Sequence, residues 1–309
     1  MRKRLIVTGK EGQASLKFVF AQMQTTENNL IINSKNKKDE NYFRLHSEQD
    51  VEKFKRIKSH DFSDSIIIRW GTRIQLPEEG NIVYNTNKAI SNSSNKYTAR
   101  KLFREAGVNI PRLVTPADFT MEDLPIIARP FQHKQGKDFV VIKDYGSFLE
   151  FYKKNSGNWY FSAYIEKDAE YRIHCAHGNI LSIMQKPKPE DSSQLAWNHS
   201  ILEEEFKAIN WGNWNMDLCK MALKACNALS LDFCGLDVIV KDGIPYVLEA
   251  NTSPSLSTSP YNTEKYAKYF DWLLKSETKR EHWPFEEKKK VTSLAWKEWK
   301  FKDEKSLTE

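Results

Sequence analysis

The sequence predicts a mixed α/β fold, in which short strands and amphipathic helices alternate along the chain. Compact apolar runs at residues 5–7 and 65–69 are typical of buried strands. Residues 96–107 and 218–229 instead carry apolar side chains at three- and four-residue spacing, which indicates helices. Residues 235–254 form two apolar runs around an Asp-Gly turn, the pattern of a β-hairpin.

The N-terminal part of the chain supplies the first two strands. The strand at 5–7 is followed by glycines at positions 9 and 12 that do not fit a phosphate-binding loop, so we expect a turn there. The strand at 65–69 ends at Trp70-Gly71. We expect a loop at 33–41, and turns or helix caps in the Asn- and Ser-rich segment 85–95.

Further elements follow closely from Lys96 onward. Lys96 opens a helix that Gly107 ends, and Pro111 starts an extended segment. Strands are expected at residues 126–129, 139–142, 160–165, 171–176 and 180–184, with a short helix at 145–152. A long helix before the hairpin is marked by Leu218, Met221, Ala222, Ala225 and Leu229.

Length and composition indicate an ordinary soluble protein. A chain of 309 residues, 40% hydrophobic and 28% charged, can form about two or three domains. No apolar run approaches the ~20 residues of a membrane span, and the run after Arg4 is too short for a signal peptide. The four cysteines lack CxxC spacing, which argues against zinc. We therefore expect a cytoplasmic protein with free thiols and no membrane contact.

The excess positive charge lies at the N-terminal end. Residues 1–60 hold thirteen Lys and Arg against seven Asp and Glu, a difference of six that equals the formal net charge of +6. Such a region can dock an acidic protein, whereas we do not expect nucleic acid as a partner. The alternative is a solvated, lysine-rich surface. Residues 276–309 are also charged and are expected to form a tail or helix.

The hairpin carries oxygen ligands suited to a hard cation. Asp237 lies on its first arm, and Glu249 and Asn251 end its second arm on one face. A two-residue loop would place Asp237 and Glu249 on opposite faces, whereas a three-residue loop, residues 241–243, would place them on the same face. If the hairpin binds metal, we therefore expect the three-residue loop. The alternative is an ordinary half-exposed hairpin with a charged end.

Scattered polar residues upstream complete a pattern that resembles a known superfamily. In chain order these are Lys96, Arg129 at the end of a strand, Glu170-Tyr171-Arg172, and Lys186 after a strand. With Asp237 and Glu249-x-Asn251, this order resembles the ATP-grasp superfamily, particularly the D-alanine–D-alanine ligases and the ribosomal-protein glutamate ligases. The resemblance extends from Asn95 to about Tyr261.

The resemblance implies an ATP-grasp fold, in which two α+β lobes grip ATP, preceded by a small α/β N-terminal domain. It implies an N-terminal domain at 1–92 and an ATP-grasp unit at 93–275. Within that unit the small lobe would span about 112–165 and the large lobe about 166–275.

The resemblance also implies roles for individual residues. Lys96 and Arg129 would bind the α/β-phosphates, and Glu170 the ribose hydroxyls. The backbone of Ala163, Tyr164 and Ile165 would face adenine at the hinge. Arg172 and Lys186 would act catalytically on the transferred phosphoryl group. Asp237, Glu249 and Asn251 would bind two Mg²⁺ ions, with Glu249 bridging them and Mn²⁺ able to substitute.

Three positions depart from the family pattern. The flap at residues 132–137 has one glycine where many members have several, so Lys134, Lys137 or His133 would assist phosphate closure. Gly235 stands where D-alanine ligases have arginine, which argues against that substrate. Ser255 stands where a glycine is common. His174 and His177, expected on opposite faces of a strand, are interpreted as structural residues.

The function that this pattern predicts is an ATP-dependent carboxylate–amine ligase that works through an acylphosphate. Its substrates would be small-molecule, amino-acid or peptide carboxylates and amines. One alternative is an ATP-grasp kinase that phosphorylates a hydroxyl. Another is a non-catalytic ATP-binding module that docks a partner through its basic N-terminal region.

Overall fold

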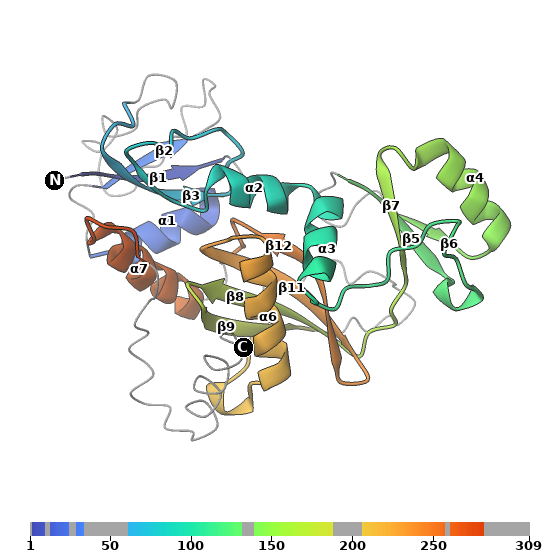
Figure 1. Ribbon diagram of the computed structural model, residues 1–309. Helices are drawn as coiled ribbons and strands as arrows, with labels where there is room; N and C mark the ends of the chain where they lie inside the picture. The colour runs from blue at the N-terminus through green and yellow to red at the C-terminus, as the bar shows by residue number, and fades with distance from the viewer. Residues whose placement is uncertain are drawn as a thin grey trace, which may run out of the picture.

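Three β-sheets form the body of the protein. The computed structural model describes residues 2–9, 13–24, 29–33, 61–131, 139–187, 206–256 and 260–280. A four-stranded N-terminal sheet, a five-stranded central sheet and a three-stranded small sheet follow one another along the long axis (Figure 1). The predicted mixed fold is confirmed.

The N-terminal sheet is parallel, with strand order β2-β1-β3-β4. Its strands are β1 (Lys3–Thr8), β2 (Asn29–Asn33), β3 (Ser65–Trp70) and β4 (Ile82–Tyr84), and helix α1 (Gln13–Gln22) lies between β1 and β2 in the chain. The strands predicted at 5–7 and 65–69 lie within β1 and β3. Because parallel strands share direction, the loops after β3 and β4 leave from the same edge.

Two helices connect this sheet to the rest of the molecule. Helix α2 (Asn87–Ser94) occupies the Asn-rich segment in which turns and caps were expected, and Thr86 caps it by accepting from Ala89 N–H. Its buried Ala89 and Ile90 compensate for weak helix formers. Helix α3 (Lys96–Glu105) begins at Lys96 after an Asn95 cap, as predicted.

The small sheet has strand order β6-β5-β7 and its own core. Strands β5 (Ile126–Pro130), β6 (Val140–Ile142) and β7 (Trp159–Ala163) are antiparallel, and α4 (Tyr145–Asn155) packs through the buried Phe148. A 3-10 turn, η4 (Met121–Asp123), precedes β5.

The central sheet has strand order β10-β9-β8-β11-β12 and is antiparallel throughout. The bounds of its strands are β8 (Ala169–Ala176), β9 (Asn179–Lys186), β10 (Lys207–Ala208), β11 (Phe233–Lys241) and β12 (Ile244–Asn251). A 3-10 turn, η6 (Trp211–Asn213), leads to α6 (Met216–Ala228), which shares a core with α3 and one face of this sheet.

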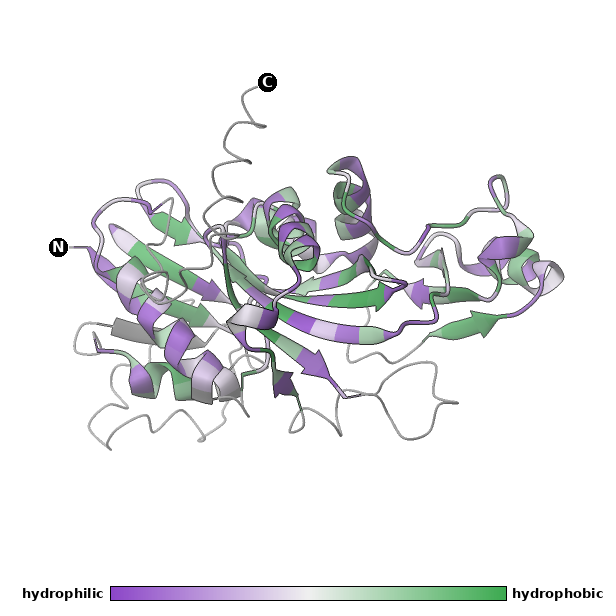
Figure 2. Ribbon diagram, turned by 90° about the horizontal axis from the view of Figure 1, so that it is seen from below, coloured by the Kyte–Doolittle hydropathy of each residue, from purple (hydrophilic) through white to green (hydrophobic). Residues whose placement is uncertain are grey.

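Helix α7 (Pro260–Leu274) joins the N-terminal and central sheets. Its Tyr266 and Phe270 are fully buried in one cluster with Trp70 of β3 and Phe233 of β11. The hydropathy colouring shows apolar residues concentrated in the strands and on inward stripes of the helices (Figure 2).

Several expectations lie outside the described residues. These are most of the loop at 33–41, the flap at 132–137, and the segment 281–309 of the expected tail. Among the described residues, no helix is long and apolar enough to span a membrane.

Candidate active site

The metal hairpin reaches the expected side-chain arrangement by an unexpected route. The three-residue loop is wrong: Lys241 pairs with Ile244, so the loop is Asp242-Gly243, with φ of 49° and 78°. A register shift between Asp237 and Val238 leaves Leu248 as an extra residue on β12 and places Asp237 directly opposite Glu249. Directly opposite residues share a face, so this bulge brings the two carboxylates together.

Charged residues form a row across three strands of the central sheet. Arg172 on β8 pairs with Asp237 on β11, which pairs with Glu249 on β12. Glu170, two residues before Arg172, shares its face and lies opposite Lys186 on β9. The strand register therefore brings together five residues that the sequence singled out.

Ion pairs connect the members of this row. Arg172 donates from Nε to Asp237 Oδ1 at 2.9 Å and from Nη2 to Oδ2 at 3.1 Å. Lys186 Nζ bonds Glu170 and lies 3.4 Å from Asp237 Oδ1. Because all four side chains are at least nine-tenths buried, these pairs are screened little by salt.

Lys96 reaches the same place from the first turn of α3. Its ammonium forms an ion pair with Glu249, whose other oxygen accepts from Asn251 Nδ2 at 3.2 Å. Burial lowers the pKa of Lys96 to about 8; Asp237 opposes the shift, whereas Arg129, Arg100 and Arg73 add to it. Both carboxylate oxygens of Glu249 are therefore bonded to residues that were predicted to lie in the site.

The small sheet supplies the remaining predicted residues. The guanidinium carbon of Arg129 on β5 lies 5.6 Å from the Phe139 ring centroid. The positive charge of Arg129 also helps to lower the pKa of Lys96. Ala163 ends β7, and its N–H donates to Arg112 O at 2.9 Å. Tyr164 N–H donates to Pro125 O at 2.9 Å. Among the three hinge residues, the amides of Ala163 and Tyr164 are thus already bonded within the protein.

The donor set fits a hard divalent cation. Asp237 and Glu249 are opposite each other and Asn251 bonds Glu249, which gives two carboxylates and one amide of the type that Mg²⁺ prefers. Within the described residues, no group of three or more His, Cys, Asp or Glu side chains could hold a metal ion. The third protein ligand would accordingly be the amide, and each carboxylate now pairs with a cation of the chain.

Other residues near the site were missed by the sequence analysis. Lys167 bonds Glu170, and its pKa is lowered by burial. The Phe206 ring lies 5.7 Å from both Arg172 and Lys186. Arg100, one turn after Lys96, is buried with Nε and Nη1 lacking hydrogen-bond partners. The spacing of Lys96 and Arg100 on one helix face was the available signal.

The turn after Asn251 packs against two glycines. A Cβ on Gly235 would lie 2.6 Å from Pro254 Cβ, and a Cβ on Gly71 would lie 2.2 Å from Ser253 Oγ. The first contact leaves no room for a side chain at position 235 while Pro254 keeps its place. The second brings the loop after β3 to the metal hairpin.

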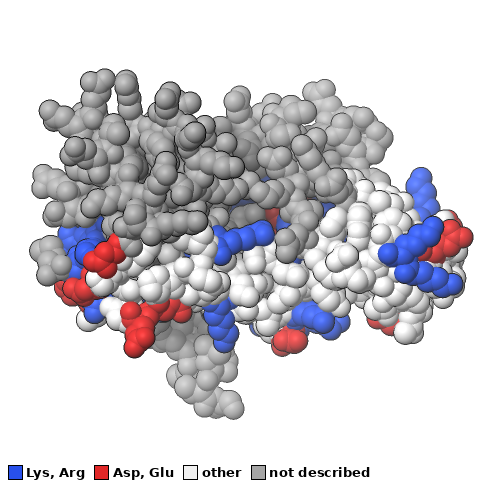
Figure 3. Space-filling model, turned by 90° about the horizontal axis from the view of Figure 1, so that it is seen from above, with Lys and Arg blue, Asp and Glu red and all other residues white. Residues whose placement is uncertain are grey.

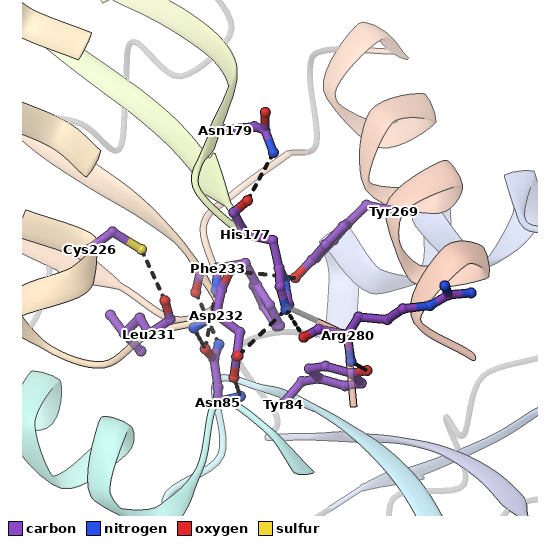
Figure 4. A network of polar contacts seen from close by, with 10 residues as sticks. All are labelled: Tyr84, Asn85, His177, Asn179, Cys226, Leu231, Asp232, Phe233, Tyr269 and Arg280. Carbon is purple, nitrogen blue, oxygen red and sulfur yellow. Dashed lines mark hydrogen bonds and ion pairs between the residues drawn. The ribbon is translucent and has the colours of Figure 1, made fainter. Parts of the chain in front are cut away.

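A polar network joins the N-terminal sheet, the central sheet and α7 (Figure 4). Asn85 donates to Phe233 O and accepts from the N–H groups of Asp232 and Phe233. His177 lies in the turn after β8, rather than on the strand, and bonds Tyr269 and Arg280 O.

His174 and the four cysteines are also buried inside the protein. His174 lies on β8, 3.2 Å from the Tyr266 hydroxyl. Both histidines thus contact internal partners, as a structural role requires. All four cysteines are free and buried.

Comparisons with known proteins bear on the fold of the chain. Residues 209–269 match the model of the RimK-like ATP-grasp domain. A probable alpha-L-glutamate ligase of Teredinibacter turnerae is 23% identical over 256 residues, which cover 72% of this chain and 80% of the relative.

Solved structures show the same architecture. The D-alanine–D-alanine ligase from Bacillus anthracis complexed with ATP is similar with a TM-score of 0.59 and 17% identity, covering 90% of this chain and 97% of that one. The ATP-grasp ligase PsnB complexed with a minimal precursor gives a TM-score of 0.63 at 15% identity, covering 90% and 100%.

The fold is that of the ATP-grasp proteins, and residues 209–269 match the RimK-like ATP-grasp domain. The similar sequences and structures cited above are named as ligases, and the L-amino acid ligase from Bacillus licheniformis is a further structure with this fold.

Proposed function

We propose that this protein is an ATP-dependent carboxylate–amine ligase that forms an amide through an acylphosphate. The observation that carries the proposal is the row Arg172–Asp237–Glu249, flanked by Lys96, Glu170 and Lys186. It combines ligands for Mg²⁺ with cations able to stabilise a transferred phosphoryl group.

The reaction follows from the roles of these residues. A substrate carboxylate attacks the γ-phosphorus of ATP, the bond to the β-phosphate oxygen breaks, and ADP leaves. An amine then attacks the acyl carbon, loses a proton and expels phosphate. Lys96 and Arg129 bind the phosphates of ATP, while Arg172 and Lys186 steady the charge on the transferred group.

Two Mg²⁺ ions at Asp237, Glu249 and Asn251 would neutralise the β- and γ-phosphates. Lys96 and Arg172, which now bond Glu249 and Asp237, would turn from these carboxylates to the phosphates when the nucleotide binds. Glu170 would accept from the ribose hydroxyls. Because the Ala163 and Tyr164 amides are bonded internally, adenine recognition falls to Ile165 N–H and to hinge carbonyls.

We propose that the catalytic unit spans about 93–275, preceded by the N-terminal domain at 1–92.

The expected acidic partner gains no support from the described residues. Arg2 and Lys3 pair with Asp64 and Asp61. On the face in Figure 3, the visible Lys and Arg side chains are interspersed with Asp and Glu. The docking of an acidic partner by residues 1–60 stays a prediction.

Hydroxylamine trapping tests the proposed reaction. An acylphosphate reacts with hydroxylamine to give a hydroxamate, whereas the phosphate ester made by a kinase does not. We expect hydroxamate and ADP in equal amounts when the protein receives ATP, Mg²⁺ and a suitable amino-acid or peptide carboxylate. A stable phosphorylated hydroxyl without hydroxamate would identify a kinase, and nucleotide binding without turnover would identify a binding module.

A further inference from the structure

The loop after β3 contacts the metal hairpin from the N-terminal side. Gly71 in this loop has φ of +68°, and its backbone lies so close to Ser253 that an added Cβ would meet Ser253 Oγ at 2.2 Å and Ser253 Cβ at 2.5 Å. Ser253 is two residues beyond Asn251. The N-terminal sheet therefore places its loop within a few residues of the proposed metal ligands.

This loop carries an exposed arginine, Arg73, two residues after Gly71. Within the described ranges, Arg73 forms no hydrogen bond or ion pair, in contrast to Arg172, Lys186 and Lys96, which each bond a carboxylate. Its positive charge is one of those that lower the pKa of Lys96. The guanidinium is thus near enough to Lys96 for its charge to act there, and none of the residues that the structure describes pairs with it.

At the hairpin, the arginine of the central sheet, Arg172, is already bonded to Asp237. Gly235 on β11 adds no side chain, and Pro254 packs over it, since an added Cβ would lie 2.6 Å from Pro254 Cβ. A carboxylate that is to attack the γ-phosphate still requires a cation beside it. The N-terminal sheet, from which this loop leaves, and the small sheet lie on opposite sides of β11 and β12 (Figure 1).

We infer that Arg73 binds the carboxylate substrate and thereby determines which acids are activated. This inference rests on the proposed ligase function and assigns its acid subsite to the loop at 71–73. A guanidinium donates one N–H to each carboxylate oxygen in a planar fork, which leaves a lone pair on each oxygen for attack on phosphorus. A lysine would keep the charge but lose the fork.

The test compares Arg73→Ala, Arg73→Lys and Arg104→Ala. Arg104 is exposed in the last turn of α3 and has no assigned role, so it provides the matched loss of one arginine. The probes are L-glutamate and a short peptide that ends in glutamate, in the hydroxamate assay and in calorimetric titrations of protein loaded with Mg²⁺ and AMPPNP. We expect both Arg73 variants to weaken the carboxylate response at least tenfold, and Arg104→Ala to match the wild type.

Nucleotide binding separates this inference from the proposed function. We expect Arg73→Lys to bind Mg²⁺·AMPPNP within threefold of the wild type, because the charge is retained. A wild type that binds no Mg²⁺·AMPPNP would defeat the proposed function. A wild type that binds the nucleotide but neither carboxylate probe, or variants with unchanged carboxylate response, would overturn the assignment of Arg73 alone.

Discussion

Arg172 forms a two-point contact with Asp237, with Nε bonded to Oδ1 at 2.9 Å and Nη2 to Oδ2 at 3.1 Å. The two residues are direct neighbours across β8 and β11. A guanidinium that occupies both oxygens of a proposed metal ligand competes with the cation. Under the proposed function, Arg172 would leave Asp237 when Mg²⁺ binds and would then be available to the phosphoryl group.

This relationship gives opposite predictions for turnover and metal affinity. In Arg172→Ala we expect hydroxamate formation to slow by ~10²–10³-fold, as loss of one donor to a transition state does. We expect Mn²⁺, followed by electron paramagnetic resonance without nucleotide, to bind more tightly, because its competitor at Asp237 is gone. Weaker Mn²⁺ binding in this variant would show that the arginine supports the metal site.

The two ligands at the end of β12 should differ in importance. Glu249→Ala is expected to remove both ions and abolish Mg²⁺-dependent ADP release, since Glu249 is the charged residue proposed to hold both of them. Asn251→Ala should retain weaker activity with a higher Mg²⁺ requirement, because it removes a neutral ligand. Glu150→Ala, an exposed carboxylate on α4, is the control. Retained ADP release in Glu249→Ala would exclude this metal assignment.

The contact between Gly71 and Ser253 can be tested with a glycine of the same backbone conformation. Gly80 has φ of +72° but open space where its Cβ would be, whereas Gly71 faces Ser253. Both alanine variants carry about 1 kcal/mol of left-handed strain. We expect urea unfolding to show a further loss in Gly71→Ala only, and Ser253→Gly to restore part of it. Equal losses would mean that Ser253 moves aside freely.

His174 should make stability depend on pH below neutrality. Burial lowers the pKa of His174 to about 3, with Arg172 adding to the shift and Asp237 opposing it. Its folded-state pKa lies below the unfolded value of 6.5, so the stabilisation is present above pH 6.5 and is lost as the pH falls toward 3. Between pH 7 and pH 5 the loss is about 2 kcal/mol.

His174→Asn, which keeps a polar group near Tyr266, should show a smaller difference between urea unfolding free energies at pH 7 and pH 5. The comparison is between slopes with pH, because the substitution itself changes stability at pH 7. An unchanged slope would assign the acid sensitivity to other groups.

The hairpin shows what sequence patterns can and cannot predict. A shared metal site requires the Asp237 and Glu249 carboxylates on the same face of the hairpin, and this requirement correctly predicted their arrangement. The predicted loop length was wrong because a bulge at Leu248 shifts the strand pairing by one residue. An extra residue in the loop would have produced the same shift. Nothing in the local sequence distinguishes the two solutions, since the shift depends on how β12 pairs with β11.

Three helices escaped prediction for different reasons. Helix α2 lies in an Asn- and Ser-rich segment, where tertiary packing overrides propensity. Helices α1 and α7 were not predicted although they carry apolar residues at helical spacing, such as Leu16, Val19 and Phe20 in α1. The ion pairs depend on strand register, so the sequence identified Arg172 and Asp237 but not their contact.

The shared core around α7 determines which sheets are tied together. Tyr266 and Phe270 pack between Trp70 of the N-terminal sheet and Phe233 of the central sheet, whereas the small sheet closes its own core around Phe148. The first two sheets therefore share one core, and the small sheet meets them mainly through α3, where Tyr97 stacks on Phe131. A shift of the small sheet would change the distance between Arg129 and Lys96 without disturbing the core that supports Asp237 and Glu249.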